Sequence, residues 1–211
     1  MNEILEVYDL TGKYLEDEER EVFYKKSIDE FKKSQKITRQ VKTVRLLLLN
    51  SQGKIFLQKR SKTKSDNKGL YDKTIGGHVS KDYSYDLAII KECAEELGFP
   101  VAVLKEDEFE RAVSSIDLSI VGIIRQIDQI SNFSSTRVTE TEDTVIQPTL
   151  VTFYVGYYNG SLRFVDGESS GIEVFSLQEL IDEIKVNPNK FTEDIKYMLE
   201  HYQKYLTPIK T

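Results

Sequence analysis

The chain has 211 residues, of which 39% are hydrophobic and 30% are charged, and these fractions are ordinary for a soluble globular protein. The net charge of −6 argues against non-specific nucleic-acid binding, so an anionic substrate would need local basic residues or a metal ion. No stretch reaches the about 18 apolar residues of a membrane helix, the N-terminus lacks a signal-peptide pattern, and the single cysteine, Cys93, excludes an internal disulfide. We therefore expect a single-domain cytoplasmic protein that binds neither nucleic acid nor membrane.

Residues 1–36 are expected to be an N-terminal extension within the same domain, and residues 37–211 its main part. Within the extension, residues 3–15 are typical of a hairpin that turns at Thr11 and Gly12, and residues 17–34 of a charged helix or loop. The aromatic residues of the extension are expected in the core, and stacking on a base is the alternative. They are Tyr8, Tyr14, Phe23 and Tyr24.

Residues 42–61 contain two apolar runs around the turn residues 50–53, and Gly53 permits the turn, so this segment is predicted to be a strong hairpin. A polar loop over residues 62–73 follows. Further strands are predicted at 99–104, 117–130 and 148–158, with a polar loop at 131–147, and helices at 176–186 and 191–206. Strands interleaved with helices predict a layered α/β protein.

The segment GGHVSKDYSYDLAIIKECAEELGF, residues 76–99, divides into a loop and a helix. Ser84 is a suitable N-cap, and Gly98 is a suitable residue just past the helix C-terminus. At about 100° per residue, one stripe of this helix is apolar, and three glutamates lie almost opposite. The stripe consists of Leu87, Ile90, Ala94 and Leu97, and the glutamates are Glu92, Glu95 and Glu96. We therefore expect the glutamates on a face away from the core.

Glutamates spaced at i, i+3 and i+4 repel one another, and the helix dipole disfavours negative charge near the C-terminus. Each penalty is on the order of a few tenths of a kcal/mol, so a solvated helix face can absorb it, as most charged faces do. A divalent cation would reverse the sign of the effect, and carboxylates on one rigid face suit Mg²⁺ or Mn²⁺. The helix alone leaves both explanations open.

The segment as a whole resembles the Nudix box, whose pattern is a glycine, five residues, a glutamate, seven residues, and then Arg-Glu-aliphatic-any-Glu-Glu-any-Gly-aliphatic. Gly77 begins the pattern, Glu92 is the first helix glutamate, and Gly98 with Phe99 ends it. Two positions depart from the box: Tyr83 stands in place of the loop glutamate, and Lys91 in place of the arginine. The resemblance implies an α-β-α sandwich with a mixed sheet in a single domain.

The flanking segments resemble the branch of the family close to isopentenyl-diphosphate isomerases, so that the resemblance spans most of the chain. Isomerase activity itself is disfavoured, because Gly76 stands where the isomerases have their catalytic cysteine. Val41 replaces an upstream metal-binding histidine, and Pro148 a late glutamate. His78 matches a metal-ligand histidine of the isomerases but lacks histidine partners, so it is expected to be a loop residue near the site.

The resemblance implies that Glu92, Glu95 and Glu96 hold Mg²⁺ or Mn²⁺ together with the backbone carbonyl of Gly76. A diphosphate repels an anionic nucleophile, so the chemistry needs a metal to neutralise phosphate oxygens and a carboxylate to take a proton from water. Glu92 and Glu95 are the candidate bases within the box. A later base could come from Glu140 or Glu142, for which a solvated acidic loop is the alternative.

Arg60 and Lys64 match positions that look like diphosphate binders in the isomerases, and an exposed charged loop is the equally supported alternative. Lys91 precedes Glu95 by four residues and is expected to pair with it. The leading hypothesis is a metal-dependent pyrophosphohydrolase acting on a nucleoside diphosphate linked to another moiety. A catalytically weak ligand-binding or regulatory domain is the alternative, and an isomerase is less favoured. The expected partner is a small-molecule diphosphate, and a homodimer is left open.

Overall fold

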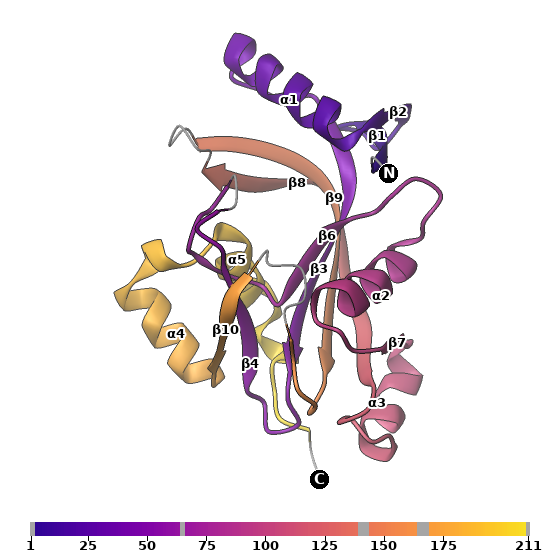
Figure 1. The fold of residues 1–211 in the computed structure, drawn as a ribbon, viewed down its shortest axis with the longest axis vertical. Coiled ribbons are helices and arrows are strands. Elements are labelled where there is room, and N and C mark those ends of the chain that lie inside the picture. Colours follow the sequence, from indigo (N-terminus) through magenta and orange to yellow (C-terminus); the bar gives the residue numbers. More distant parts are fainter. Residues whose placement is uncertain (1–2, 64–65, 139–143, 164–168, 210–211) are drawn as a thin grey trace.

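The computed structural model describes residues 3–63, 66–138, 144–163 and 169–209, which form one mixed sheet with helices on both faces (Figure 1). The strands are β1 (Ile4–Asp9), β2 (Tyr14–Glu19), β3 (Arg39–Leu49), β4 (Ile55–Arg60), β5 (Tyr71–Asp72), β6 (Ile75–His78), β7 (Val101–Val103), β8 (Gly122–Val138), β9 (Thr144–Tyr157) and β10 (Ser169–Phe175). The helices are α1 (Arg20–Ser34), α2 (Tyr85–Glu96), α3 (Glu106–Ser115), α4 (Leu177–Val186), α5 (Glu193–Tyr202) and the short 3-10 helices η1 (Pro188–Lys190) and η2 (Gln203–Tyr205).

Both predicted hairpins are present, and local chemistry explains their turns. At the β1–β2 turn the Asp9 carboxylate accepts from the Thr11 amide, and Gly12 has a φ of +87°, a conformation that suits glycine. At the β3–β4 turn the Asn50 amide oxygen accepts from the Gln52 and Lys54 amides, and Gly53 has a φ of +78°. β2 extends to Glu19, so α1 begins at Arg20 rather than earlier.

The sheet runs in the order β10-β4-β3-β9-β8-β7, and β1, with β2 beside it, adds to β3. β3 pairs parallel with β9 and antiparallel with β4, so the sheet is mixed, as predicted. Successive leucines of β3 point to opposite faces, where Leu46 and Leu48 pack with α2, and Leu47 and Leu49 pack with α4 and α5. The α-β-α arrangement and the single domain are therefore confirmed.

The polar loop predicted at residues 131–147 is wrong, because β8 and β9 continue as a long hairpin that pairs as far as Val138 and Thr144. Side chains alternate there as in any strand, with Ser135 and Gln147 buried and Ile146 half exposed. The inward positions are polar because they face a cleft rather than the core. Residues 139–143 lie outside the described part of the chain.

Three further segments differ from the sequence predictions. Residues 117–121 are not part of a strand, because the Asp117 carboxylate accepts from the Ser119 amide and closes a turn before β8 begins at Gly122. Helix α3 was not expected, although Phe109 and Val113 anchor it in the core. Strand β10 was not expected either, and it pairs antiparallel with β4 at the sheet edge.

Helix α2 has the predicted ends, since Ser84 accepts from the Leu87 amide and Gly98 has a φ of +70°. Its predicted buried face is partly right, because Leu97 is buried and Ile90 packs against the core. Leu87 is 46% exposed and Ala94 is exposed, whereas Ala88, Ile89 and Cys93 form the buried face. Glu92 and Glu96 flank this buried face and are half-buried, so they do not point away from the core as expected.

In the described part of the chain, no helix combines the length and the apolar composition that crossing a membrane requires.

Candidate functional site

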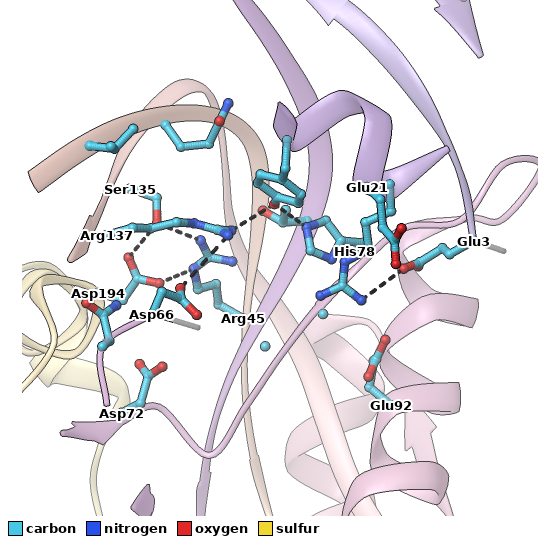
Figure 2. Close-up of a pocket in the computed structure, with 18 of the residues that line it drawn as sticks. Glu3, Glu21, Arg45, Asp66, Asp72, His78, Glu92, Ser135, Arg137 and Asp194 are labelled. Atoms are coloured by element: carbon cyan, nitrogen blue, oxygen red, sulfur yellow. Dashed lines mark hydrogen bonds and ion pairs between the residues drawn. The ribbon is translucent and has the colours of Figure 1, made fainter. Parts of the chain in front are cut away.

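A cleft of about 1810 Å³ opens between α1, α2, β6 and the β8–β9 hairpin (Figure 2). Its lining includes Gly76, Glu92, Glu95, Glu96 and Arg60, so the structure brings these predicted site residues to one place. Lys64, Glu140 and Glu142 lie outside the described residues. The volume exceeds the roughly 300–1,000 Å³ of most ligand pockets and leaves room for a large, extended molecule.

Gly77 allows β6 to lie directly against the first glutamate of α2. A Cβ atom at Gly77 would collide with the Glu92 carboxylate, and one at Gly76 would collide with the Lys73 side chain. A side chain at either position would therefore displace a charged group of the cleft. Glycine therefore suits both positions because the strand lies so close to these two charged side chains, whose flexible ends a Cβ atom would push aside.

Four carboxylates line one side of the cleft, which we call the acidic wall: Glu3, Glu92, Glu95 and Glu96. Burial raises the pKa of Glu92 to about 7, with Glu3 and Glu95 adding to the shift and Lys91 opposing it. Glu3 comes from the N-terminal extension, where its carboxylate accepts from the Ser80 hydroxyl and pairs with Arg20. Among the described residues, no three acidic, His or Cys side chains lie close enough together to hold a metal ion.

The predicted pair of Lys91 and Glu95 is present, with Nζ and Oε2 3.5 Å apart. Glu95 remains 60% exposed, so it can turn toward the cleft. Tyr83 is 39% exposed, and the Lys91 Nζ lies 6.0 Å from its ring centroid. Asp86, a nearby carboxylate, accepts a hydrogen bond of 2.7 Å from the Tyr154 hydroxyl and does not line the cleft, so it does not replace the missing loop glutamate.

The opposite side of the cleft carries what we call the ion cluster, in which three cations meet three carboxylates. Its members are Arg45, Arg60, Lys73, Asp66, Asp72 and Asp194. Asp194 Oδ2 lies 2.6 Å from Arg45 Nε and 2.9 Å from Lys73 Nζ. Burial alone would raise the pKa of Asp194, but Arg45 and Lys73 outweigh it and hold that pKa well below its usual range.

Arg60, which was expected to capture a diphosphate, is held by two carboxylates of the ion cluster. Its Nη2 lies 2.7 Å from Asp66 Oδ1, and its Nη1 lies 3.3 Å from Asp72 Oδ2. Its side chain is only 14% exposed. Arg60 therefore reaches the cleft with most of its charge already neutralised.

A chain of contacts that sequence reasoning missed crosses the cleft between these two sides. Tyr24 of α1 places its hydroxyl 2.5 Å from His78 Nε2 and accepts a 2.9 Å hydrogen bond from Arg137 Nη2 (Figure 2). Burial lowers the pKa of His78 well below its usual value, and Arg20 and Arg137 add to the shift, so His78 is neutral near pH 7. His78 belongs to strand β6 rather than to a loop.

Of the aromatic residues in the N-terminal extension, Phe23 lies in the core as expected. Tyr24 packs against the same core cluster but also lines the cleft, and Tyr14 is 50% exposed, so the core prediction is partly right for Tyr24 and wrong for Tyr14. Residues 133–137 read FSSTR, so no alternation of apolar and polar residues marks Arg137 as a strand residue. No local pattern indicates that α1 borders the cleft.

A family model described as NUDIX domain matches residues 39–201. Among solved structures, DR0079 from Deinococcus radiodurans is similar over 94% of this chain and 98% of its own, with 19% identity and a TM-score of 0.64. The NUDIX domain of Shewanella oneidensis NrtR, in a complex with ADP ribose, is similar over 85% of this chain and 98% of its own, with 14% identity and a TM-score of 0.50. A comparison with curated proteins finds no match. Because the family model covers most of the chain and the fold agrees, the chain belongs to the Nudix family.

Proposed function

We propose that the protein is a metal-dependent hydrolase that cleaves the diphosphate linkage of a nucleoside diphosphate joined to another moiety. The observation that carries the proposal is the acidic wall, where Glu92 is pressed against Gly77 beside Glu95 and Glu96 at the edge of a large cleft. Membership of the Nudix family supports hydrolysis of a diphosphate as the reaction class. The cleft volume of about 1810 Å³ supports a substrate larger than a simple diphosphate.

The carboxylates present are of the donor type that a divalent cation takes, and in the described part of the chain they would have to move closer together to ligate one ion. Glu92 is buried enough, and close enough to other carboxylates, that its pKa is raised to about 7, and a cation would relieve that cost. Glu92, Glu95 and Glu96, with the carbonyl of Gly76, would hold Mg²⁺ or Mn²⁺, both of which prefer oxygen ligands. When bound, the metal neutralises phosphate oxygens and lowers the pKa of water.

The remaining roles, taking a proton from water and orienting the groups of the cleft, are assigned to side chains of the protein. Glu92 and Glu95 are the two candidates to take the proton of the attacking water, and Lys91 orients Glu95 through their 3.5 Å pair. The ion cluster fixes the opposite side of the cleft, because each of its cations has a carboxylate partner within 3.0 Å. α1 supplies part of the lining of the cleft.

A second candidate is a ligand-binding or regulatory Nudix domain with weak catalysis. Tyr83 favours it, because this residue stands where the box has a loop glutamate, and Asp86 is engaged by Tyr154 rather than facing the cleft. The NrtR domain bound to ADP ribose makes that compound a reasonable member of any substrate panel. That the chain belongs to the branch close to isopentenyl-diphosphate isomerases stays a prediction. Isomerase activity itself is disfavoured, since Gly76 has no thiol and Cys93 is fully buried.

The test is a product-release assay across diphosphate compounds that include ADP-ribose, nucleoside diphosphate sugars and dinucleoside polyphosphates, with Mg²⁺ or Mn²⁺ present. We expect turnover of at least one compound, and a loss on the order of 100-fold in Glu92→Gln because that change removes a metal ligand. Glu108→Gln, an exposed glutamate of α3, is the matched control and should leave turnover unchanged. Tight binding of a compound with no turnover would replace the hydrolase by the ligand-binding alternative.

A further inference from the structure

We propose, on the basis of the proposed function, that Arg137 binds a phosphate of the diphosphate substrate, and that Tyr24 of the N-terminal helix positions its guanidinium. This assignment replaces Arg60 as the anion-binding cation of the cleft. It extends the substrate site beyond α2 to a residue of the β8–β9 hairpin. It also gives the N-terminal extension a role in binding, although the family model begins only at residue 39.

The first step of the argument is charge. Within the ion cluster, Arg45, Arg60 and Lys73 each have a carboxylate oxygen between 2.6 and 2.9 Å away. Arg137 lies 3.9 Å from its nearest described carboxylate, Asp66, which is already engaged by Arg60. Three cations therefore meet three carboxylates at short distance, and Arg137 adds a fourth positive charge that the described residues compensate only through the longer 3.9 Å contact with Asp66.

The second step is access and donor capacity. The Arg137 side chain is 25% exposed, and the residue lines the cleft, so a ligand can reach it. A guanidinium has five N–H donors, and one of them is used by the Tyr24 hydroxyl. The remaining donors form a planar fork that matches two oxygens of a phosphate.

The third step is position relative to the acidic wall. Gly77 touches Glu92, the next residue is His78, and Tyr24 joins His78 to Arg137 by hydrogen bonds of 2.5 and 2.9 Å. Figure 2 shows Glu92 and Arg137 on opposite sides of the cleft, with His78 between them. A diphosphate lying across this gap would meet carboxylate-held metal at one end and a guanidinium at the other.

Tyr24 is a positioning residue in this arrangement. Its hydroxyl accepts from Arg137, and the Arg137 guanidinium carbon lies 4.7 Å from the Tyr24 ring centroid. The ring therefore restricts the guanidinium on one side and leaves the other donors directed to the cleft. Tyr24→Phe removes the hydrogen bond but keeps the ring, so its effect isolates orientation from charge.

The binding test uses calorimetry with α,β-methylene-ADP, a diphosphate that cannot be cleaved between its phosphorus atoms, in the presence of Mg²⁺. We expect Arg137→Gln to weaken binding about 10- to 100-fold, which is the range for losing charge-assisted hydrogen bonds. Arg137→Lys should recover part of the loss because it keeps the charge but not the fork. Tyr24→Phe should weaken binding less than Arg137→Gln. Arg111→Gln, an exposed arginine of α3, is the matched control and should bind as the wild type does.

Thermal melting of each variant first shows whether it folds. If Arg137→Gln does not fold, the affinity of Arg137→Lys compared with that of the wild type tests the assignment of Arg137. Wild-type affinity in a folded Arg137→Gln variant, or in Arg137→Lys when only that variant folds, would overturn the assignment of Arg137. Turnover with an unchanged KM in that variant would also overturn the assignment of Arg137, but the proposed hydrolase function would stand. A wild-type protein that neither binds the analogue nor cleaves any diphosphate would overturn the proposed function together with this inference.

Discussion

The two sides of the cleft treat buried charge in opposite ways. In the ion cluster, every charged group meets an opposite charge, and the pKa of Asp194 is held well below its usual range because Arg45 and Lys73 outweigh burial. In the acidic wall, burial and like charges raise the pKa of Glu92 to about 7. The ion cluster pairs its charges without a ligand. In the acidic wall, a charged Glu92 carboxylate costs free energy because it is buried near other carboxylates, and a bound cation would remove that cost. The scaffold side is therefore marked by paired charges, whereas in the acidic wall Glu3 and Glu95 have cationic partners and Glu92 is the carboxylate whose pKa burial raises.

The largest expected effect is on stability, when the ion cluster loses one member. Among the described residues, Asp194→Asn leaves the buried Arg45 without a carboxylate partner, while Lys73 keeps only Asp72, and removing one member of a buried ion pair costs about 3–5 kcal/mol. Urea denaturation should show this loss in the free energy of unfolding. The matched control is Asp182→Asn, whose side chain is 57% exposed and whose effect should stay within about 0.5 kcal/mol. A loss below about 1 kcal/mol in Asp194→Asn would show that the cluster is not balanced as described.

The contribution of Glu92, in the acidic wall, to the free energy of unfolding should change with pH in the opposite direction to that of a paired carboxylate. The folded protein holds the Glu92 proton up to a pKa of about 7, while the unfolded chain releases it near 4.5. The folded state therefore binds more protons across this window, so the contribution of Glu92 to stability falls as the pH rises from about 5 to 8. We expect Glu92→Gln to gain stability relative to the metal-free wild type over this range, by on the order of 1–3 kcal/mol at pH 8. Parallel pH profiles for the two proteins would contradict the raised pKa.

A smaller effect is expected where the box lacks its loop carboxylate. Tyr83→Glu adds a carboxylate at the rim beside Lys91 and should raise turnover about tenfold if it supplies a supporting interaction of about 1.4 kcal/mol in the transition state. Steady-state kinetics with Mg²⁺ measures the change. A fall from robust wild-type turnover would mean that Tyr83 itself serves the substrate.

The smallest effect is expected for Lys91→Arg. A guanidinium can hold Glu95 with two hydrogen bonds where the lysine now makes a 3.5 Å contact, so Glu95 should be better oriented. The gain should be smaller than that of Tyr83→Glu, because both side chains of this pair are substantially exposed. The same kinetics measures it, and a gain exceeding that of Tyr83→Glu would reverse the ranking.

Local patterns predicted the parts of the fold that local chemistry determines. The turns at Gly12 and Gly53, the cap at Ser84 and the terminus at Gly98 all depend on neighbouring residues, and all were found from sequence. The buried face of α2 was found only in part: Ile90 and Leu97 pack inward as predicted, whereas Leu87 and Ala94 are apolar without being covered.

The site was predicted only as far as the motif extends. Gly76 and the three glutamates of α2 do line one cleft. Asp194 and Arg45 were not paired in advance, because long-range folding brings them together from α5 and β3. Arg137 was missed because its strand turns polar residues inward, toward a cleft, and polar alternation looks like a loop. Glu3 and Tyr24 belong to the N-terminal extension, whose contact with the cleft no local motif encodes.

The most direct test of the central claim is a calorimetric titration of the protein with Mn²⁺. We predict that the wild type binds the cation and that Glu96→Gln binds it at least about tenfold more weakly, since a cation site built from carboxylates depends on their number and charge. Glu108→Gln should bind as the wild type does. Equal Mn²⁺ affinity in the wild type and Glu96→Gln would contradict the assignment of the acidic wall as a metal site.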